Sequence, residues 1–297
     1  MGNAPSEFKQ VLSGVTPADK TYRANASLTA KQYSAVRALV IGIGYDKTDY
    51  KLAGTRNDAK AVTDYLTRRF PDNLTLLQLN DAKDTPVDRL PTKKNLGQAM
   101  RFLCSSAPLD SYGSGDHPAL GENILLIVYY SGHGSQIDDY GFDERDGADE
   151  TLCFLSDNCR DIDHLVDDEI NDHYRNMIPS SADVVTIFDC CHSGSSLDLK
   201  YTLKGNMFVN DGAQYTPTPY PVYYIGGTID SLCSYEKNGR GYLTQVLIGI
   251  LTKYKNLTIQ TLSLMVKAEL AKLISPSLQT VTFGSGQQIS SQQQFPL

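Results

Sequence analysis

The sequence predicts an α/β fold in which a mostly parallel sheet is covered by helices on both faces. Short, uninterrupted apolar runs alternate with segments of helical periodicity along most of the 297 residues. Continuous apolar runs are typical of strands buried on both sides, and their alternation with helices is typical of parallel sheets. A chain of this length, with 41% hydrophobic residues, can bury a sizeable core without disulfide support.

The first half of the chain is expected to begin with a buried strand that ends in glycine, over residues 37–44. A helix should follow, capped by Asn57 or Asp58 and ended by Pro71. The next elements are expected, in order, as a strand at 74–79, a helix at 93–104, a strand at 123–131, a short strand at 151–155, a helix at 168–177 and a strand at 184–188. An acidic loop should separate the strand at 123–131 from the short strand.

The second half opens with a stretch rich in turn-forming residues after Gly194, including three prolines between 217 and 221. A strand at 222–225 and helices at 242–254 and 259–274 are expected beyond it. From Gly284 onward the chain is too polar for a core, although Phe295 could pack into one. Because the connection between the halves is short, we expect one continuous sheet.

Composition excludes some classes of protein and favours a cytoplasmic one. The longest apolar run, Ile124 to Tyr130, has seven residues, whereas a membrane-spanning helix needs roughly 20. No apolar signal segment follows the N-terminus, and six cysteines that include an adjacent pair indicate reduced thiols. The sequence from Met1 to Ser6 fits the myristoylation pattern at Gly2, so membrane contact is expected only if Gly2 is modified.

Charge is distributed unevenly around a net value of −7. The segment from Asp138 to Asp172 contains 14 acidic and only two basic residues, whereas basic residues exceed acidic ones elsewhere. No stripe of lysine and arginine is present, so nucleic-acid binding is not expected. The acidic block is either a solvated loop or a cation site.

Chemically useful residues follow two of the expected strands. The sequence YSGHGS ends one strand at residues 130–135, and DCCHSG ends another at 189–194. Ligands bind at the carboxyl ends of strands in open parallel sheets, and a thiol beside an imidazole is the minimal nucleophile for acyl transfer. The partner of the thiol should be His133, because His192 is a chain neighbour of the cysteines and points away. The alternative is that the cysteines are buried thiols and His133 completes a turn, but two glycine-framed motifs favour a catalytic site.

These two motifs resemble the histidine and cysteine motifs of the metacaspases. The resemblance continues through DETLC at 149–153, LVDDEI at 165–170, the IGIGY strand and the AGTRNDA stretch, and covers residues 36–200. It implies a caspase-like α/β/α sandwich around a mostly parallel sheet. On this basis the chain divides into an N-terminal arm (1–34), a large-subunit-like catalytic region (35–200), a connector (201–221) and a small-subunit-like region that completes the same sheet (222–297).

The resemblance also implies a calcium-activated cysteine endopeptidase that cleaves protein or peptide substrates after Arg or Lys. It places a Cys-His dyad at Cys191 and His133, with the oxyanion held by the backbone N–H groups of Gly134 and Cys191. Carboxylates suit a basic side chain in the substrate pocket. The substrate-binding residues implied are Thr55, Asp58, Ser131 and Asp189. Autocleavage is expected after Lys200 or Lys204 in a flexible connector, and the protein is expected to be a monomer.

Calcium is the one cofactor that the resemblance implies, and it gives the acidic block a purpose. The implied ligands are Asp149, Asp167, Asp168 and Asp198. Calcium takes oxygen ligands from flexible loops, which clustered carboxylates can supply. Zinc bound through Cys153, Cys159, His164 and His173 is the alternative, although these residues lack the usual zinc-ligand spacing. No organic cofactor is expected.

The chain departs from the family pattern at two places. In GGTIDSLCSYE (226–236), Leu232-Cys233 replaces a Gln-Thr pair and Glu236 replaces an aspartate. After DETLC, Phe154 and Ser156 stand where a proline and an aspartate are common. Two other functions therefore stay open, namely a weakly active or inactive relative that acts as a scaffold or aggregate-handling protein, and a legumain-like or caspase-like protease of different specificity.

Overall fold

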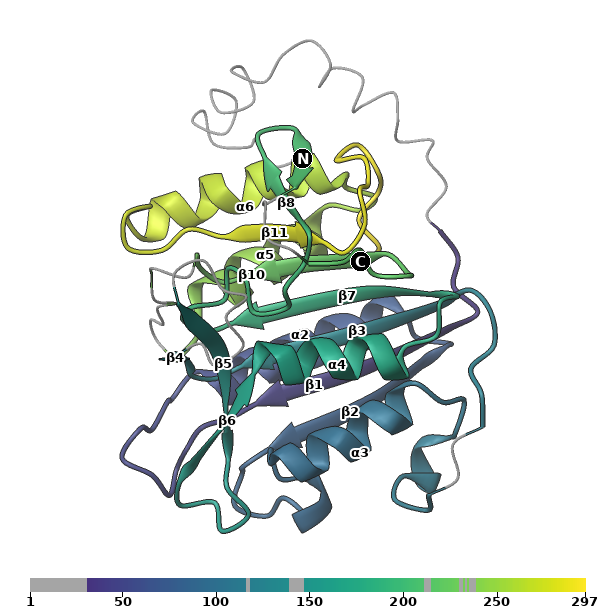
Figure 1. Cartoon of the computed structure of the whole chain (residues 1–297), viewed down its shortest axis with the longest axis vertical. Helices are drawn as coiled ribbons and strands as arrows, with labels where there is room; N and C mark the ends of the chain where they lie inside the picture. Colours follow the sequence, from purple (N-terminus) through teal and green to yellow (C-terminus); the bar gives the residue numbers. More distant parts are fainter. Residues whose placement is uncertain are drawn as a thin grey trace.

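The computed structural model describes residues 31–115, 118–138, 147–210, 215–229, 232, 234 and 239–297. The large sheet contains, in chain order, β1 (Ala35–Gly42), β2 (Leu74–Asn80), β3 (Ile124–Ser131), β7 (Ala182–Asp189), β8 (Tyr201–Lys204), β9 (Met207–Asn210), β10 (Val222–Gly226) and β11 (Thr282–Ser285). Across the sheet these strands lie in the order β2-β1-β3-β7-β10-β11-β8-β9 (Figure 1). A smaller sheet of β4 (Gly134–Asp138), β5 (Ala148–Leu155) and β6 (Ile162–Val166) lies at one end.

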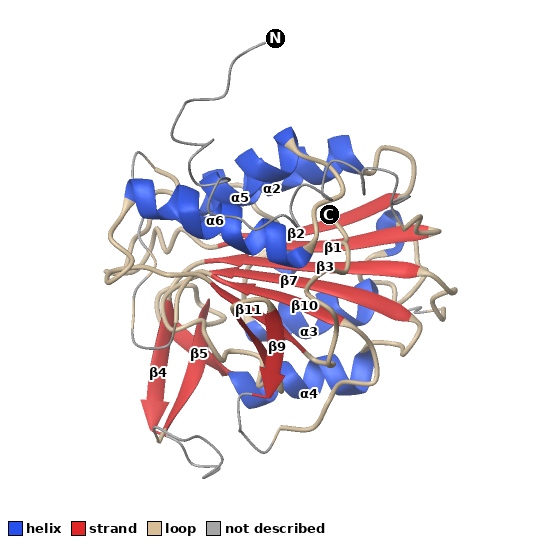
Figure 2. Cartoon of the chain, turned by 90° about the horizontal axis from the view of Figure 1, so that it is seen from above, coloured by secondary structure: helices blue, strands red, loops and turns tan. Residues whose placement is uncertain are grey.

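Helices cover both faces of the large sheet, which confirms the predicted fold class (Figure 2). One face packs against α2 (Thr55–Arg69), α5 (Tyr242–Lys253) and α6 (Ile259–Leu273), and the other against α3 (Lys93–Leu103) and α4 (Asp167–Met177). The 3₁₀ helices η3 (Val87–Arg89) and η4 (Leu109–Ser111) join α3 to its neighbours in the chain. Each face carries its own apolar core, because the central strands are buried on both sides.

The central strands are parallel, so their carboxyl ends meet at one edge. β1 pairs in parallel with β2 and β3, β3 with β7, and β7 with β10. In this register Ser131, the last residue of β3, lies opposite Asp189, the last residue of β7. The histidine and cysteine motifs therefore leave the sheet side by side, as the sequence predicted.

The predicted start of α2 is wrong. The helix begins at Thr55 and its N-cap is Gly54, so neither Asn57 nor Asp58 caps it. Asp58 lies inside the first turn, where a carboxylate is favoured by the helix dipole. Its Oδ2 atom accepts a hydrogen bond from the backbone N–H of Gly241, 2.8 Å away, at the start of α5.

Part of the expected acidic loop is sheet. β4 and β6 pair in antiparallel fashion with the two edges of β5, which is itself longer than the predicted short strand. The polar and charged residues of β4 and β6, which are mostly half-buried, concealed these two strands in the sequence. Residues 139–146 of the acidic block lie outside the described residues.

The connector and the polar C-terminal segment also contain strands that the sequence reading missed. β8 and β9 form a hairpin whose turn includes Gly205 at a φ of 65°. Lys204 is therefore a strand residue rather than part of a flexible connector. β11 ends inside the segment that was expected, from Gly284 onward, to be too polar for a core, and pairing with β10 and β8 buries Gly284 and Ser285.

The two ends of the described chain are attached to the core. Tyr33 is buried and its hydroxyl donates to Asp183, 2.7 Å away, so residues 31–34 of the expected arm pack on the fold. Phe295 is 1% exposed, which confirms that it enters the core. The arm from residue 1 to 30, including Gly2, lies outside the described residues. Among the residues that are described, no helix is long and apolar enough to cross a membrane.

Candidate active site

The backbone of His133 is fixed by two buried tyrosine hydroxyls. The hydroxyl of Tyr45 accepts from the N–H of His133 at 2.9 Å, and that of Tyr130 donates to its carbonyl at 2.8 Å. Tyr45 also donates to the carbonyl of Cys153 at 2.6 Å, which ties the motif to β5. Gly132 is required here, because a Cβ atom on it would lie 2.5 Å from the Tyr130 hydroxyl.

The imidazole of His133 is oriented by a backbone carbonyl. Its Nε2 atom lies 2.7 Å from the carbonyl oxygen of Tyr50, in the loop after β1. A carbonyl can only accept, so Nε2 carries the proton and Nδ1 is the basic nitrogen of the neutral ring. The ring also contacts that of Tyr45, with the two centroids 4.8 Å apart. This arrangement suits a general base held by a third group.

The two adjacent cysteines differ in burial. Cys190 is 1% exposed, and burial raises the pKa of its thiol well above the usual value. Cys191 is partly exposed, and its Sγ accepts from the backbone N–H of Ser234 at 3.3 Å. A Cβ atom on Gly134 would lie 2.0 Å from the carbonyl oxygen of Cys191, so the segments that carry His133 and Cys191 are in direct contact.

The turn after Cys191 is held against the end of β10. The hydroxyl of Ser193 donates to the carbonyl of Cys190 and accepts from the N–H of Thr228, both at 3.1 Å. The hydroxyl of Tyr224 donates to the carbonyl of Ser193. His192 has a φ of 49°, which allows the chain to turn sharply immediately after the thiol.

Two buried carboxylates, Asp58 and Asp189, converge beside this thiol. A Cβ atom on Gly241 would lie 2.4 Å from Oδ2 of Asp189 and 3.0 Å from Oδ2 of Asp58. Asp189 accepts from the N–H and hydroxyl of Thr244 at 3.0 and 2.7 Å, and from the hydroxyl of Ser234 at 2.6 Å. Burial raises the pKa of Asp189, and these hydrogen bonds oppose that shift. Ser234 therefore connects the carboxylate pair to the thiol.

The other two residues expected in the substrate pocket are buried. The hydroxyl of Thr55 donates to the carbonyl of Ile43 at 2.6 Å, within the loop that leads to α2. Ser131, at the end of β3, is 2% exposed. Thr55 lies one helical turn before Asp58, and Ser131 lies opposite Asp189 in the sheet, so both are close to the carboxylate pair although neither is exposed.

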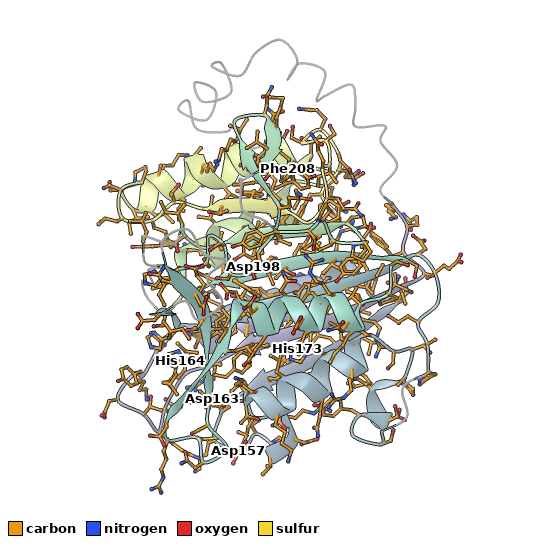
Figure 3. All side chains as sticks on the ribbon, viewed as in Figure 1. Asp157, Asp163, His164, His173, Asp198 and Phe208 are labelled. Carbon is orange, nitrogen blue, oxygen red and sulfur yellow. The ribbon has the colours of Figure 1, made fainter. Side chains whose placement is uncertain are left out.

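The four carboxylates expected to bind calcium have different surroundings. Asp149, Asp167 and Asp198 are buried, whereas Asp168 is exposed. Asp167 accepts from the backbone N–H groups of Glu150 at 2.9 Å and of Asp168 at 3.0 Å. Asn171 of α4 donates to the carbonyl of Leu197 at 2.8 Å, which holds the segment bearing Asp198 near the helix (Figure 3).

This donor set consists of carboxylate oxygens, which is the chemistry that calcium prefers. Within the described ranges, however, no three histidine, cysteine, aspartate or glutamate side chains are grouped closely enough to hold a metal ion. The alternative zinc set is therefore not assembled. His164 lies on β6 and His173 on α4, and burial lowers the pKa of His173 (Figure 3).

Several contacts of the site have no signal in a single sequence. The carbonyl of Tyr50 and the N–H of Ser234 are backbone groups, and any residue type could supply them. Thr244 is an ordinary helix residue until α5 is placed against β7. Of these residues, only Ser234 could be suspected of a role from the sequence, because it lies in the segment that departs from the metacaspase pattern.

The structure thus defines the class of the protein as an α/β sandwich that places a cysteine and a histidine at the ends of adjacent parallel strands. Residues 36–200 match the family model of the metacaspase, peptidase C14 domain, over more than half of the chain. The chain therefore belongs to the metacaspase family.

Individual relatives agree with this assignment. The chain is 35% identical to Metacaspase-1 of Arabidopsis thaliana over 173 residues, which cover 57% of this chain and 42% of that protein. It is 32% identical to Metacaspase-1 of Kluyveromyces lactis over 206 residues, which cover 67% of this chain and 44% of that protein. The chain thus spans less than half the length of these relatives.

Two solved structures share the fold. A crystal structure of a Geobacter sulfurreducens protein gives a TM-score of 0.58 at 18% identity, covering 84% of this chain and 93% of that one. Caspase-1 from Spodoptera frugiperda gives 0.52 at 13% identity, covering 89% and 94%. At these identities the likeness concerns the fold alone, and it confirms the expected caspase-like architecture.

Proposed function

We propose that this chain is a cysteine endopeptidase that cleaves polypeptides after Arg or Lys. The observation that supports this specificity most strongly is the pair of buried carboxylates, Asp58 and Asp189, joined through Ser234 to the Cys191 thiol. A guanidinium or ammonium group that enters beside Gly241 would meet two carboxylates at close range. Charge-assisted hydrogen bonds of this kind are roughly twice as strong as neutral ones.

In the proposed mechanism, Nδ1 of His133 removes the proton of the Cys191 thiol. The thiolate attacks the carbonyl carbon of the substrate, and the N–H groups of Gly134 and Cys191 stabilise the negative charge on its oxygen. His133 then gives the proton to the leaving amine, so that an acyl-enzyme remains on the sulfur. A water molecule, deprotonated by His133, hydrolyses the thioester and regenerates the thiol.

Peptides that end in Arg, Lys or Asp before a fluorogenic amide test this function. We expect wild-type protein to cleave the Arg and Lys peptides and to spare the Asp peptide. Cys191→Ala and His133→Ala should each lower kcat by several orders of magnitude. Cys190→Ala is the matched control and should retain most activity, because its thiol is buried and protonated. Preference for Asp, or an active Cys191→Ala variant, would contradict the proposal.

We further propose that calcium raises this activity by drawing together Asp149, Asp167, Asp168 and Asp198, which in this structure are not grouped closely enough to hold a metal ion. When bound, the ion would neutralise carboxylates that otherwise repel one another next to the catalytic loops. The buried Glu150 links the acidic region to the nucleophile loop. Its backbone N–H donates to Asp167, and its carboxylate accepts from the hydroxyl of Ser195, four residues after the nucleophile. An ordered acidic region would therefore also position the nucleophile loop. We expect calcium to bind in the weak range known for protein calcium sites, about 10⁻⁴–10⁻³ M.

Calorimetry and activity assays together test the calcium proposal. We expect heat of binding and increased kcat on adding millimolar calcium, with a weak response to magnesium, which sheds its water reluctantly. The double variant Asp167→Asn, Asp168→Asn should lose both responses. Asp172→Asn, an exposed acid on the same helix, should keep both. Full activity in excess chelator would contradict the proposal.

A further inference from the structure

An open groove of about 610 Å³ lies on the histidine side of the catalytic pair. Tyr50, His133 and Gly134 are among the residues that line it. Arg160, Ile162 and His164, from β6 and the turn before it, also line it. The carboxylate pair beside Gly241 does not line this groove.

The groove and the carboxylate pair lie towards opposite faces of the large sheet. Asp58 belongs to α2, and Asp189 is bonded to the first turn of α5, on one face. The groove is lined in part by Cys153, which packs in the core on the α3 and α4 face. The small sheet β4–β6 lies on this second side (Figure 2). His133 and Cys191 lie between the two recesses, at the shared edge.

On the proposed function, the carboxylate pair holds the Arg or Lys side chain before the cut, so the groove on the His133 side is left for the residues after it. The amine that leaves takes its proton from His133, so the chain beyond the cut must run along the imidazole. Because the groove is built around His133, we infer that it binds the segment of substrate that follows the cut bond, with the Tyr50 side chain as the contact for the first residue of that segment. This inference rests on the proposed endopeptidase function.

Tyr50 is suited to such a contact because its ring is exposed to solvent, whereas its backbone carbonyl is already bonded to His133. The side chain is 61% exposed, although it stands edge-on to the His133 ring with a centroid distance of 6.3 Å. Tyrosine is enriched at binding interfaces, because its ring is apolar and its hydroxyl can remain in water. The groove also contains Arg160 together with the acids Asp49 and Asp161, so its net charge is small. Near Tyr50, selection should therefore depend on apolar contact and favour an aromatic or large aliphatic residue after the cut.

Internally quenched peptides with Arg before the cut, and either Phe or Gly after it, test this subsite. For wild-type protein we expect kcat/KM for the Phe peptide to exceed that for the Gly peptide about tenfold, the usual size of an apolar pocket contact. Tyr50→Ala should reduce this ratio to about one, and Tyr50→Phe should preserve it. Val87→Ala, an 80% exposed apolar residue outside the groove, should leave the ratio unchanged.

A coumarin amide of the same Arg peptide separates the subsite from the chemistry, because it has no amino acid after the cut. Tyr50→Ala could also disturb His133 through the Tyr50 backbone. Such an effect would lower kcat/KM for the amide and for both peptides by the same factor, so it would cancel in the ratio of the two peptides. A wild-type ratio near one, or a Tyr50→Ala variant with the full ratio, would overturn the subsite while leaving the proposed function intact. If wild-type protein with and without calcium cleaves neither amide nor peptides, both proposals fail.

Discussion

Two tyrosine hydroxyls bind the backbone of His133, in addition to the N–H of Cys153 on the neighbouring strand β5. Tyr45 and Tyr130 are completely buried, and burial raises the pKa of both phenols well above the usual value, so they stay protonated. Each hydroxyl is therefore a permanent donor as well as an acceptor. The position of the general base depends on two side chains that take no part in the proposed chemistry.

Tyr45→Phe should lower both activity and stability. The change leaves the N–H of His133 and the carbonyl of Cys153 without this buried partner, which costs about 1–3 kcal/mol of unfolding free energy. We expect kcat to fall about tenfold with little change in KM, because a displaced base affects chemistry more than binding. Tyr174→Phe is the control, since its buried hydroxyl bonds to Thr186 away from the site. It should lose similar stability in urea and keep kcat; equal kcat losses would contradict the positioning role.

Asp189 should make the preference for basic substrates dependent on pH. Burial raises its pKa above the ordinary value of 3.8, so on acidification it becomes neutral earlier than an exposed aspartate. A neutral carboxyl group no longer attracts a guanidinium. The ratio of kcat/KM for an Arg peptide to that for a neutral citrulline peptide should therefore fall as the pH falls through this raised pKa.

Titration of the dyad affects kcat/KM for both peptides equally, so it does not change their ratio. In Asp189→Asn the ratio should be low and flat with pH. Thermal unfolding should accompany the assay, because Asp189 also bonds to the first turn of α5. A ratio that is independent of pH in wild-type protein would argue against Asp189 as a substrate contact.

At the scale of elements, long and fully buried strands were predictable and short or half-exposed ones were not. β3 and β7 are buried at every position, so each forms one apolar run that is easily recognised in the sequence. β4, β6, β8 and β11 have four or five residues each and mixed polarity, so only tertiary pairing identifies them. For the same reason, His133 and Cys191 could be predicted as site residues, because each follows a long apolar strand. The role of the Tyr50 carbonyl could not be predicted, because it lies in a loop.

The hairpin of β8 and β9 makes the two predicted autocleavage positions unequal. A protease binds its substrate as an extended, unpaired chain, and Lys204 is paired with Met207 inside the hairpin. Lys200 precedes β8 in a bend and has no strand partner of its own. We expect any self-cleavage to occur after Lys200 first, as measured by mass spectrometry of protein incubated with calcium. Lys200→Ala should then prevent the early product, and Lys204→Ala should not; a first cut after Lys204 would contradict this order.

At the scale of the whole molecule, the C-terminal segment closes the core on the α5 and α6 side. Phe295 packs against Tyr223 of β10, with ring centroids 6.2 Å apart, and its N–H donates to the carbonyl of Leu257 at 2.8 Å. A polar, Gln- and Ser-rich segment thus carries one of the large buried side chains of this face.

Phe295→Ala should lower the free energy of unfolding by about 3–5 kcal/mol, the usual cost of a cavity left by phenylalanine. Leu278→Ala, at a side chain that is 47% exposed, should change it by less than about 0.5 kcal/mol. Urea unfolding followed by circular dichroism measures both. Equal stability of the two variants would show that the C-terminal segment is not part of the folded core.

The parallel pairing of β3 with β7 also determines when the chain can become proteolytically active. His133 and Cys191 come from strands that are distant in the sequence, and only the finished sheet brings them together. While a ribosome is still making the chain, the histidine emerges long before the cysteine, and neither has its partner. On the proposed function, a nascent or heat-denatured chain cannot hydrolyse its neighbours. Loss of the fold is therefore itself a safeguard, because a misfolded copy becomes a client of protein quality control rather than an uncontrolled peptidase.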